Sequence, residues 1–305
     1  MEASLMLHVL THNILPVFSM LALGFLLGRF GKISRDEAAA VNRVAFLVLQ
    51  PALILPLIAS VDLSAFRFDA LVIYALCQTG TFIIAFVVAR RVFGRDTVES
   101  WLLAMATVFV NSLLYIYPIS TLIYGGAAAL PITAIVAWDA SVTFAFFIVT
   151  TDLMANRRAK PMDSLRRVAS NPVLIAIVLG SMANLIALPV PEPLLTAMHF
   201  AGAGAAPLTL FALGVILSSH AILPTPTVMA ISGIKLLAFP LLVWAALHVA
   251  PLPEDWNKLF LLNSAGPSGA MAFALAMLHG VRTDAIAPVI IWTSLLSLIS
   301  LAALA

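Results

Sequence analysis

The sequence predicts an all-α integral membrane protein with ten transmembrane helices, arranged as two inverted repeats of five helices. Three observations predict this fold class. Of the 305 residues, 62% are hydrophobic and only 10% are charged, whereas soluble domains carry about 25% charged residues. Apolar segments of about 20 residues, the length that crosses a bilayer, recur along the whole chain. Basic residues gather in alternate connections between these segments.

The apolar segments define the predicted spans, and two of them contain polar and helix-breaking residues. These two are the fourth and the ninth, which are predicted to be broken crossover helices. The predicted spans are 12–31, 38–59, 69–91, 98–124, 130–154, 171–189, 195–218, 226–249, 256–280 and 284–304.

The distribution of basic residues predicts the orientation of the chain, because Lys and Arg are enriched in cytoplasmic loops. The connection at 155–170 carries Arg157, Arg158, Lys160, Arg166 and Arg167, and is predicted to be a cytoplasmic loop. The loops on the same side also carry Arg29, Lys32, Arg35, Arg43, Arg90, Arg91, Arg95 and Arg282, whereas those on the opposite side carry Arg67 and Lys258. Both termini are therefore predicted to lie outside.

A recurring separation predicts an internal repeat. Pro16 and Pro172, Gly24 and Gly180, and Pro51 and Pro207 are each 156 residues apart. The first repeat is predicted to cover 1–154 and the second 171–305, on either side of the loop. Because five is an odd number of spans, the second repeat enters the membrane from the opposite side, an architecture of many secondary transporters.

The two predicted breaks share residue types that do not suit the middle of a membrane helix. A proline lacks an N–H and clashes with the preceding turn, and irregular backbone in a bilayer is tolerated where it is buried in protein or lines a wet cavity. A half-helix N-terminus offers free N–H groups and partial positive charge, which suit a carboxylate. The alternative is that these prolines are packing kinks. The candidate substrate-binding residues are Asn111, Ser112 and Pro118 in the first break and Asn263, Ser264, Gly266, Pro267 and Ser268 in the second.

Two charged residues lie inside predicted spans. Asp139 is near the middle of 130–154, and Lys235 is in 226–249. Charged residues at such depth are costly and mark functional positions by default. Lys235 is predicted to attract an anionic substrate, and Asp139 to take up a proton, bind a coupling cation or pair with Lys235. A structural ion pair between them is the alternative.

Other classes of function find little support in the sequence. There is no phosphate-binding loop of an ATP-driven motor and no metal-ligand spacing, and no nucleophile–base arrangement is visible, so neither cofactor nor metal is predicted and the chain is not expected to be an enzyme. The basic residues form no separate patch, which excludes nucleic acid as a partner. The single cysteine, Cys77, is expected to act as a small apolar residue.

The chain resembles the auxin efflux carrier family of membrane transporters, which includes plant auxin exporters and bacterial malonate and malate permeases. The resemblance covers essentially the whole chain. It implies a scaffold domain and a mobile transport domain, with substrate held where the fourth and ninth helices cross, at Pro118 and Pro267. Met271 stands where many relatives have an asparagine. The matching stretches are ILPVFSMLALGFLLGRFGKIS at 14–34, NRVAFLVLQPALIL at 42–55, NSLLYIYPISTLIYG at 111–125, NPVLIAIVLGSMANLI at 171–186, AAPLTLFALG at 205–214, KLLAFPLL at 235–242 and GPSGAMAFALAMLHG at 266–280.

Together these features predict a permease of the inner (cytoplasmic) membrane. It would move a small organic anion, a mono- or dicarboxylate such as malonate, by alternating access. Coupling to H⁺ or Na⁺ and assembly as a homodimer are left open, and membrane lipid is the surrounding partner. One alternative is a bile-acid-type sodium-coupled symporter, which would need carboxylate and amide ligands at the crossover. The other alternative is a receptor, a channel or a membrane enzyme.

Overall fold

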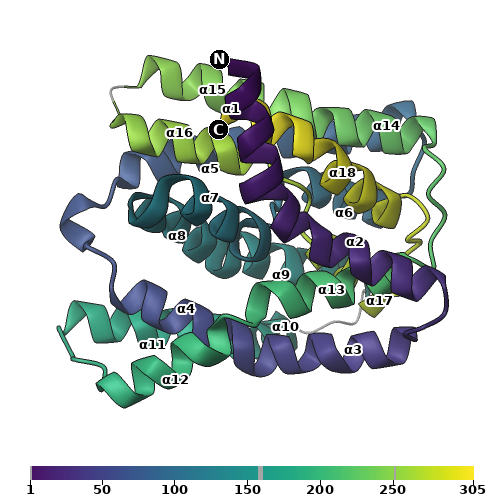
Figure 1. Ribbon diagram of the computed structural model, residues 1–305. Helices are drawn as coiled ribbons and strands as arrows, with labels where there is room; N and C mark the ends of the chain where they lie inside the picture. Colours follow the sequence, from purple (N-terminus) through teal and green to yellow (C-terminus); the bar gives the residue numbers. More distant parts are fainter. Residues whose placement is uncertain (1, 157–160, 251) are drawn as a thin grey trace.

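The computed structural model describes residues 2–156, 161–250 and 252–305, and these residues form helices with no β-strand (Figure 1). The α-helices are α1 (Glu2–Val9), α2 (Leu15–Arg29), α3 (Arg35–Val44), α4 (Gln50–Ala59), α5 (Phe68–Val87), α6 (Thr97–Val108), α7 (Tyr117–Tyr124), α8 (Ala129–Trp138), α9 (Phe144–Ala155), α10 (Pro161–Ala169), α11 (Pro172–Leu185), α12 (Glu192–Gly202), α13 (Ala205–Leu217), α14 (Pro226–Gly233), α15 (Phe239–Val249), α16 (Glu254–Ser264), α17 (Met271–Leu278) and α18 (Ile286–Leu304).

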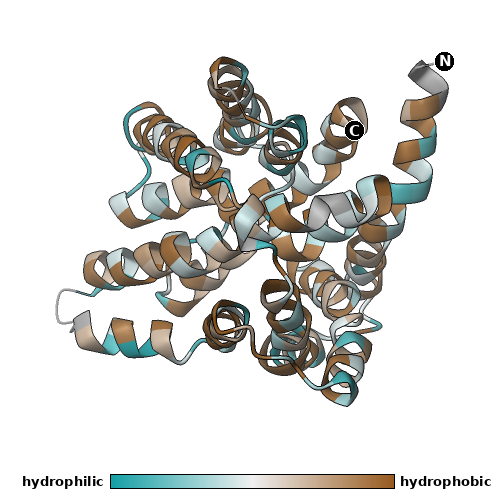
Figure 2. Ribbon diagram, turned by 90° about the vertical axis from the view of Figure 1, so that its left-hand side faces the viewer, coloured by the Kyte–Doolittle hydropathy of each residue, from teal (hydrophilic) through white to brown (hydrophobic). Residues whose placement is uncertain are grey.

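Seven continuous helices among the described residues are long and apolar enough to cross a membrane, or eight if the bent pair α10–α11 is one span. Large apolar side chains such as Leu76 and Leu241 are exposed on them, and hydrophobic residues predominate on helices at the periphery of Figure 2. These surfaces suit lipid. The seven are Leu5–Arg29, Arg35–Ala59, Phe68–Val92, Leu130–Ala155, Glu192–Leu217, Pro226–Val249 and Ile286–Leu304.

The two predicted broken spans are each divided into shorter helices. The helix α6 ends at Val108, and the next helical turn begins at Ser112 and continues into α7. The helix α16 ends at Ser264, and α17 begins at Met271. The prediction that the fourth span, 98–124, breaks at Pro118 is wrong, because Pro118 lies within α7 and the break is at 109–111.

A widened turn explains why the chain stays helical at Pro118. A proline ring normally clashes with the carbonyl four residues earlier and removes its hydrogen bond. Here that carbonyl belongs to Leu114, in the middle of a π-helical turn, where the helix is locally wider. The same pairing occurs four times: Pro16 after Leu10–Ile14, Pro51 after Ala45–Leu49, Pro118 after Ser112–Ile116 and Pro240 after Ile234–Ala238.

The helices form two bundles that each take members from both halves of the chain. In the first bundle, α2 and α3 pack on α13, and α4 packs on α11 and α12. The second bundle contains α5 to α9 and α14 to α18. Figure 1 shows α3, α4, α11 and α12 along one edge of the molecule and α14, α15 and α16 along the opposite edge.

Glycines allow the closest contacts in the first bundle, and these contacts are related by the predicted repeat. A Cβ on Gly24 of α2 would overlap the carbonyl oxygen of Phe211 in α13. A Cβ on Gly180 of α11 would lie 2.8 Å from the carbonyl oxygen of Leu55 in α4. Gly24 and Gly180 are 156 residues apart, and so are Leu55 and Phe211. The two helix pairs therefore meet through equivalent positions.

The segment predicted as a loop, 155–170, contains the amphipathic helix α10. This helix meets α11 at an angle of 63°. Of the basic residues predicted to mark the cytoplasmic side, Arg157, Arg158 and Lys160 lie outside the described residues, whereas Arg166 and Arg167 lie on α10.

Candidate functional site

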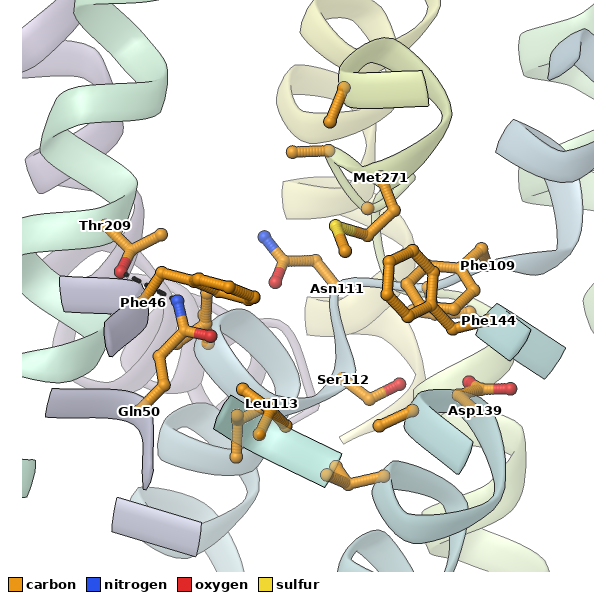
Figure 3. Close-up of a pocket in the computed structure, with 18 of the residues that line it drawn as sticks. Phe46, Gln50, Phe109, Asn111, Ser112, Leu113, Asp139, Phe144, Thr209 and Met271 are labelled. Atoms are coloured by element: carbon orange, nitrogen blue, oxygen red, sulfur yellow. Dashed lines mark hydrogen bonds between the residues drawn. The ribbon is translucent and has the colours of Figure 1, made fainter. Parts of the chain in front are cut away.

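A cavity of about 190 Å³ lies between the two bundles, at the first break. The first bundle and the turn that precedes α4 contribute Phe46, Gln50 and Thr209 to its wall, and the second contributes the break itself. In Figure 3 the Asn111 side chain extends into the space between Phe46 and Met271. The wall combines aromatic rings with amide and hydroxyl groups, a composition typical of small-molecule sites.

The two breaks cross directly and satisfy each other's backbone. Val110 and Ser268 form an isolated antiparallel bridge. The Gly269 N–H donates to the Phe109 carbonyl at 2.7 Å, and the Asn111 N–H donates to the Pro267 carbonyl at 3.1 Å. A Cβ on Gly269 would lie 3.1 Å from the same Phe109 oxygen, so the close approach favours glycine. Irregular backbone inside a membrane protein requires such internal partners.

At each break, the last carbonyl of the preceding half-helix accepts a hydrogen bond from a polar side chain of another helix. The Gln78 Nε2 of α5 donates to the carbonyl of Val108, the last residue of α6, at 3.3 Å. The Lys235 Nζ donates to the carbonyl of Ser264, the last residue of α16, at 2.6 Å. Val108 and Ser264 are 156 residues apart, and Gln78 and Lys235 are 157 apart. Gln78 and Lys235 thus perform the same task at the two half-helix ends, one residue out of the 156-residue register.

The environment of Lys235 differs from the predicted one. Its side chain is fully buried, its Nζ lies 5.0 Å from the centre of the Phe239 ring, and it does not line the cavity. A cation at a helix C-terminus compensates the partial negative charge there. The structure thus places Lys235 against the end of α16, behind the crossing.

Asp139 lines the cavity and is almost fully buried. Its Oδ1 accepts a hydrogen bond of 2.8 Å from Gln78 Nε2, and the Gln78 Oε1 in turn accepts one of 3.0 Å from Trp138 Nε1. Of the roles predicted for Asp139, the ion pair with Lys235 is not found between these two described side chains. Asp139 accepts from Gln78, and Lys235 donates to the Ser264 carbonyl.

Both polar residues predicted at the first break reach the cavity. Asn111 is half-buried, and Ser112 is buried with a hydroxyl that has no hydrogen-bonding partner in the described part of the chain. Pro118 lies seven residues further on, inside α7, and does not line the cavity. The first break therefore presents the Asn111 amide to a ligand, and the buried Ser112 hydroxyl lies beside it without a partner in the described part of the chain.

The polar residues predicted at the second break face other parts of the protein. The Asn263 Nδ2 donates to the Tyr74 hydroxyl at 2.8 Å, and the Ser264 Oγ donates to the Leu261 carbonyl at 2.7 Å. The Ser268 N–H donates to Thr293 Oγ1 at 3.1 Å. This break reaches the cavity through Gly269, Ala270 and Met271.

Gly266 and Pro267 also belong to the crossing rather than to the cavity wall. A Cβ on Gly266 would overlap the Ile116 side chain, so its absence allows the end of α16 to touch the turn that follows the first break. The carbonyl of Pro267 accepts the Asn111 N–H. Of the five residues predicted at the second break, 263–264 and 266–268, Pro267 contacts Asn111 directly, through its carbonyl.

Sequence reasoning missed several polar groups of the site. Gln78 holds both Asp139 and the end of α6, and a glutamine inside the apolar stretch 69–91 was the available signal. Gln50 and Thr209 face the first break from the other bundle, joined by a 3.3 Å hydrogen bond (Figure 3). They are single polar residues in apolar helices, and no spacing pattern connects them.

Comparison with known proteins gives three matches. The family described as "Membrane transport protein" matches residues 9–164 and 162–305. An "Uncharacterized transporter" of Methanothermobacter thermautotrophicus is 28% identical over 298 residues, covering 95% of this chain and 96% of the relative. A "Putative malonate transporter" of Rhizobium meliloti is 25% identical over 303 residues, covering 94% and 92%.

Proposed function

The chain belongs to the membrane transport protein family, the auxin efflux carrier family that its sequence resembles, and from this premise we propose that it is a secondary transporter for a small organic anion. The predicted family and the multi-pass membrane location are confirmed, and the family and its relatives are transporters rather than enzymes. The proposed substrate is a mono- or dicarboxylate such as malonate, carried across the cytoplasmic membrane.

The proposed architecture is ten spans in two inverted repeats, 1–154 and 171–305, with both termini outside. The seven long helices, the two broken helices and α11 together supply ten spans. The paired contacts of Gly24 and Gly180 support the repeat. Figure 1 places the connections after α2 and α13 at one end of the molecule and those after α4 and α11 at the other. The former side carries Arg29, Lys32 and Arg35, in agreement with a cytoplasmic position.

The observation that carries the proposal is that the two broken helices cross at the wall of a cavity between two bundles. When one bundle moves against the other, a site at this boundary opens first to one side of the membrane and then to the other, as in many transporters. Gln50 and Thr209 belong to one bundle and Asn111 to the other, so a bound ligand would contact both.

In the proposed site, Asn111 and Ser112 hold the carboxylate through hydrogen bonds from uncharged side chains, and the aromatic rings of Phe46, Phe109 and Phe144 surround its carbon atoms. The Pro267 carbonyl of the second break holds the Asn111 backbone from behind. Asp139 is the proposed coupling residue, because it is the charged group in the cavity wall and takes one hydrogen bond from Gln78. Proton exchange at this carboxylate would link its charge to loading of the site.

The test is uptake of labelled malonate by the purified protein in proteoliposomes. Asn111→Ala is expected to raise KM at least about tenfold, since a hydrogen bond to a charged group contributes about 1.5–3 kcal/mol. Asn263→Ala is the matched control, because that asparagine bonds Tyr74 outside the cavity. Its KM should stay within about twofold. Equal KM values for Asn111→Ala and the wild type would overturn the assigned site.

The driving ion is tested in the same vesicles. We expect uptake without sodium, accelerated by an inward proton gradient, and loss of that acceleration in Asp139→Asn. Strict dependence on sodium would favour the bile-acid-type symporter instead. Saturable uptake with counterflow would separate a carrier from a channel.

A further inference from the structure

A second cavity, of about 350 Å³, lies beside the central one at the junction of α10 and α11. The two cavities share Phe46, Phe144, Asn171, Met271 and Ala274 in their walls. The second one adds Arg167 and Ser170, and Arg167 is its charged lining residue. It therefore adjoins the central cavity on the side where α10 and α11 meet.

The central cavity has the wrong charge to attract an anion on its own. Among its described lining residues Asp139 is charged, and none is a lysine or an arginine. The buried Lys235 is committed to the Ser264 carbonyl. An anion that approached from the α10 side would meet the Arg167 guanidinium first.

The Arg167 guanidinium is only partly committed to the protein. Its Nη1 donates to Asp152 Oδ1 at 3.1 Å, and its side chain is 51% exposed. Arginine has five N–H donors in a planar fork that matches a carboxylate. Several donors are thus free to bind a second carboxylate from the cavity.

Asp152 has polar neighbours other than Arg167. Ser164 Oγ donates to its Oδ2 at 2.5 Å, and His279 Nε2 lies 2.8 Å from its Oδ1. The carboxylate itself is 2% exposed, whereas the guanidinium opens to the cavity. Asp152 therefore anchors Arg167 without covering it.

We propose that this second cavity is a binding site for the carboxylate substrate in front of the central site, with Arg167 as its cation. The site takes a small carboxylate with a short hydrocarbon body, because apart from Ser170 and Asn171 the rest of its wall is apolar, with side chains such as Ile148 and Leu275. Met271, Phe46 and Phe144 separate it from the central site. The inference rests on the proposed transport of organic anions.

The test is equilibrium binding of labelled malonate to the purified full-length protein. The wild type is expected to bind malonate at two sites. Arg167→Gln should weaken one site at least about tenfold, from the loss of a charged hydrogen-bonding group, and leave the Asn111 site intact. Arg166→Gln removes the neighbouring exposed arginine, which does not line the cavity, and should bind as the wild type does.

A second variant separates substrate binding from a merely structural role of Arg167. Asp152→Asn releases the guanidinium from its ion pair, so the second site should tighten, by about threefold or more. If Arg167 acts only as a partner of Asp152, Asp152→Asn and Arg167→Gln will change binding in the same direction. That result, or a single site in the wild type, would overturn the inference. Thermal unfolding checks that each variant is folded.

The outcomes also distinguish the inference from the proposed function. If malonate neither binds to nor is transported by the wild type, the proposed substrate fails. If the wild type transports malonate and Arg167→Gln binds it at two unchanged sites, the second site fails while the transporter proposal stands.

Discussion

The first break, at 109–111, and the second, at 265–270, have the same backbone plan and opposite uses of their side chains. In both, the last carbonyl of a half-helix accepts a hydrogen bond from a side chain of another helix. The donor is Gln78 at the first break and Lys235 at the second. The first break places Asn111 and Ser112 in the cavity wall, whereas the Asn263 side chain donates to Tyr74 and neither Asn263 nor Ser268 lines the cavity. The two breaks therefore have similar backbone arrangements, and the polar side chains that line the cavity come from the first.

The two residues that bind the half-helix ends, Gln78 and Lys235, also differ in charge. The first half-helix is held by a neutral amide, which also holds Asp139, so a negative charge sits beside the cavity. The second is held by a buried ammonium. Asp139 and Lys235 thus lie beside different breaks, and no ion pair joins these two described side chains.

The largest effect is expected from separating the two breaks. Gly269→Val would place side-chain atoms against Phe109, whose carbonyl lies 3.1 Å from the Cβ position. Overpacking of this kind costs about 1–3 kcal/mol, and we expect malonate uptake to fall at least about tenfold with a lower unfolding temperature. Gly80→Ala on α5 is the matched control, because a Cβ there meets open space. Uptake and stability like those of the wild type in Gly269→Val would show that the crossing tolerates separation.

A smaller effect on transport, with a clear effect on stability, is expected at Lys235. Lys235→Met leaves the Ser264 carbonyl without its partner, which costs about 1–3 kcal/mol for a buried acceptor. Lys235→Gln should recover part of that loss, since an amide performs the corresponding task at Val108. The KM for malonate should change by less than about twofold in both variants. A tenfold rise in KM at unchanged unfolding temperature would return Lys235 to the role of attracting substrate.

The sequence allowed the existence of the two breaks and their pairing to be predicted, because Asn-Ser, Pro and Gly residues are unusual in apolar segments. It did not locate the first break. Pro118 was the visible signal, but a π-helical turn absorbs that proline. Asn111 and Ser112 were found by residue type, and the structure places both at the cavity.

The partners of the buried polar residues could not be predicted in the same way. The partner of Lys235 is a backbone carbonyl that is free only because α16 ends at Ser264, and no residue type reports where a helix ends to that precision. The partner of Asp139 is Gln78, on a helix that is distant in the sequence, and a single glutamine forms no recurring pattern along the chain. Such contacts depend on packing between helices rather than on local sequence.

The smallest effect is expected from making the second break resemble the first. Met271 begins α17, is half-buried and lines both cavities. Met271→Asn would add an amide opposite Asn111, and stability should change by less than about 1 kcal/mol because the position is not fully buried. A neutral hydrogen bond contributes about 0.5–1.5 kcal/mol, so the KM for malonate should fall about two- to tenfold, with a smaller change for acetate, which has one carboxylate. Met271→Leu keeps the apolar volume and serves as the control. An equal change for both acids would mean that the second break lies too far from the bound dicarboxylate to contact it, and the asymmetry between the breaks would then reflect packing alone.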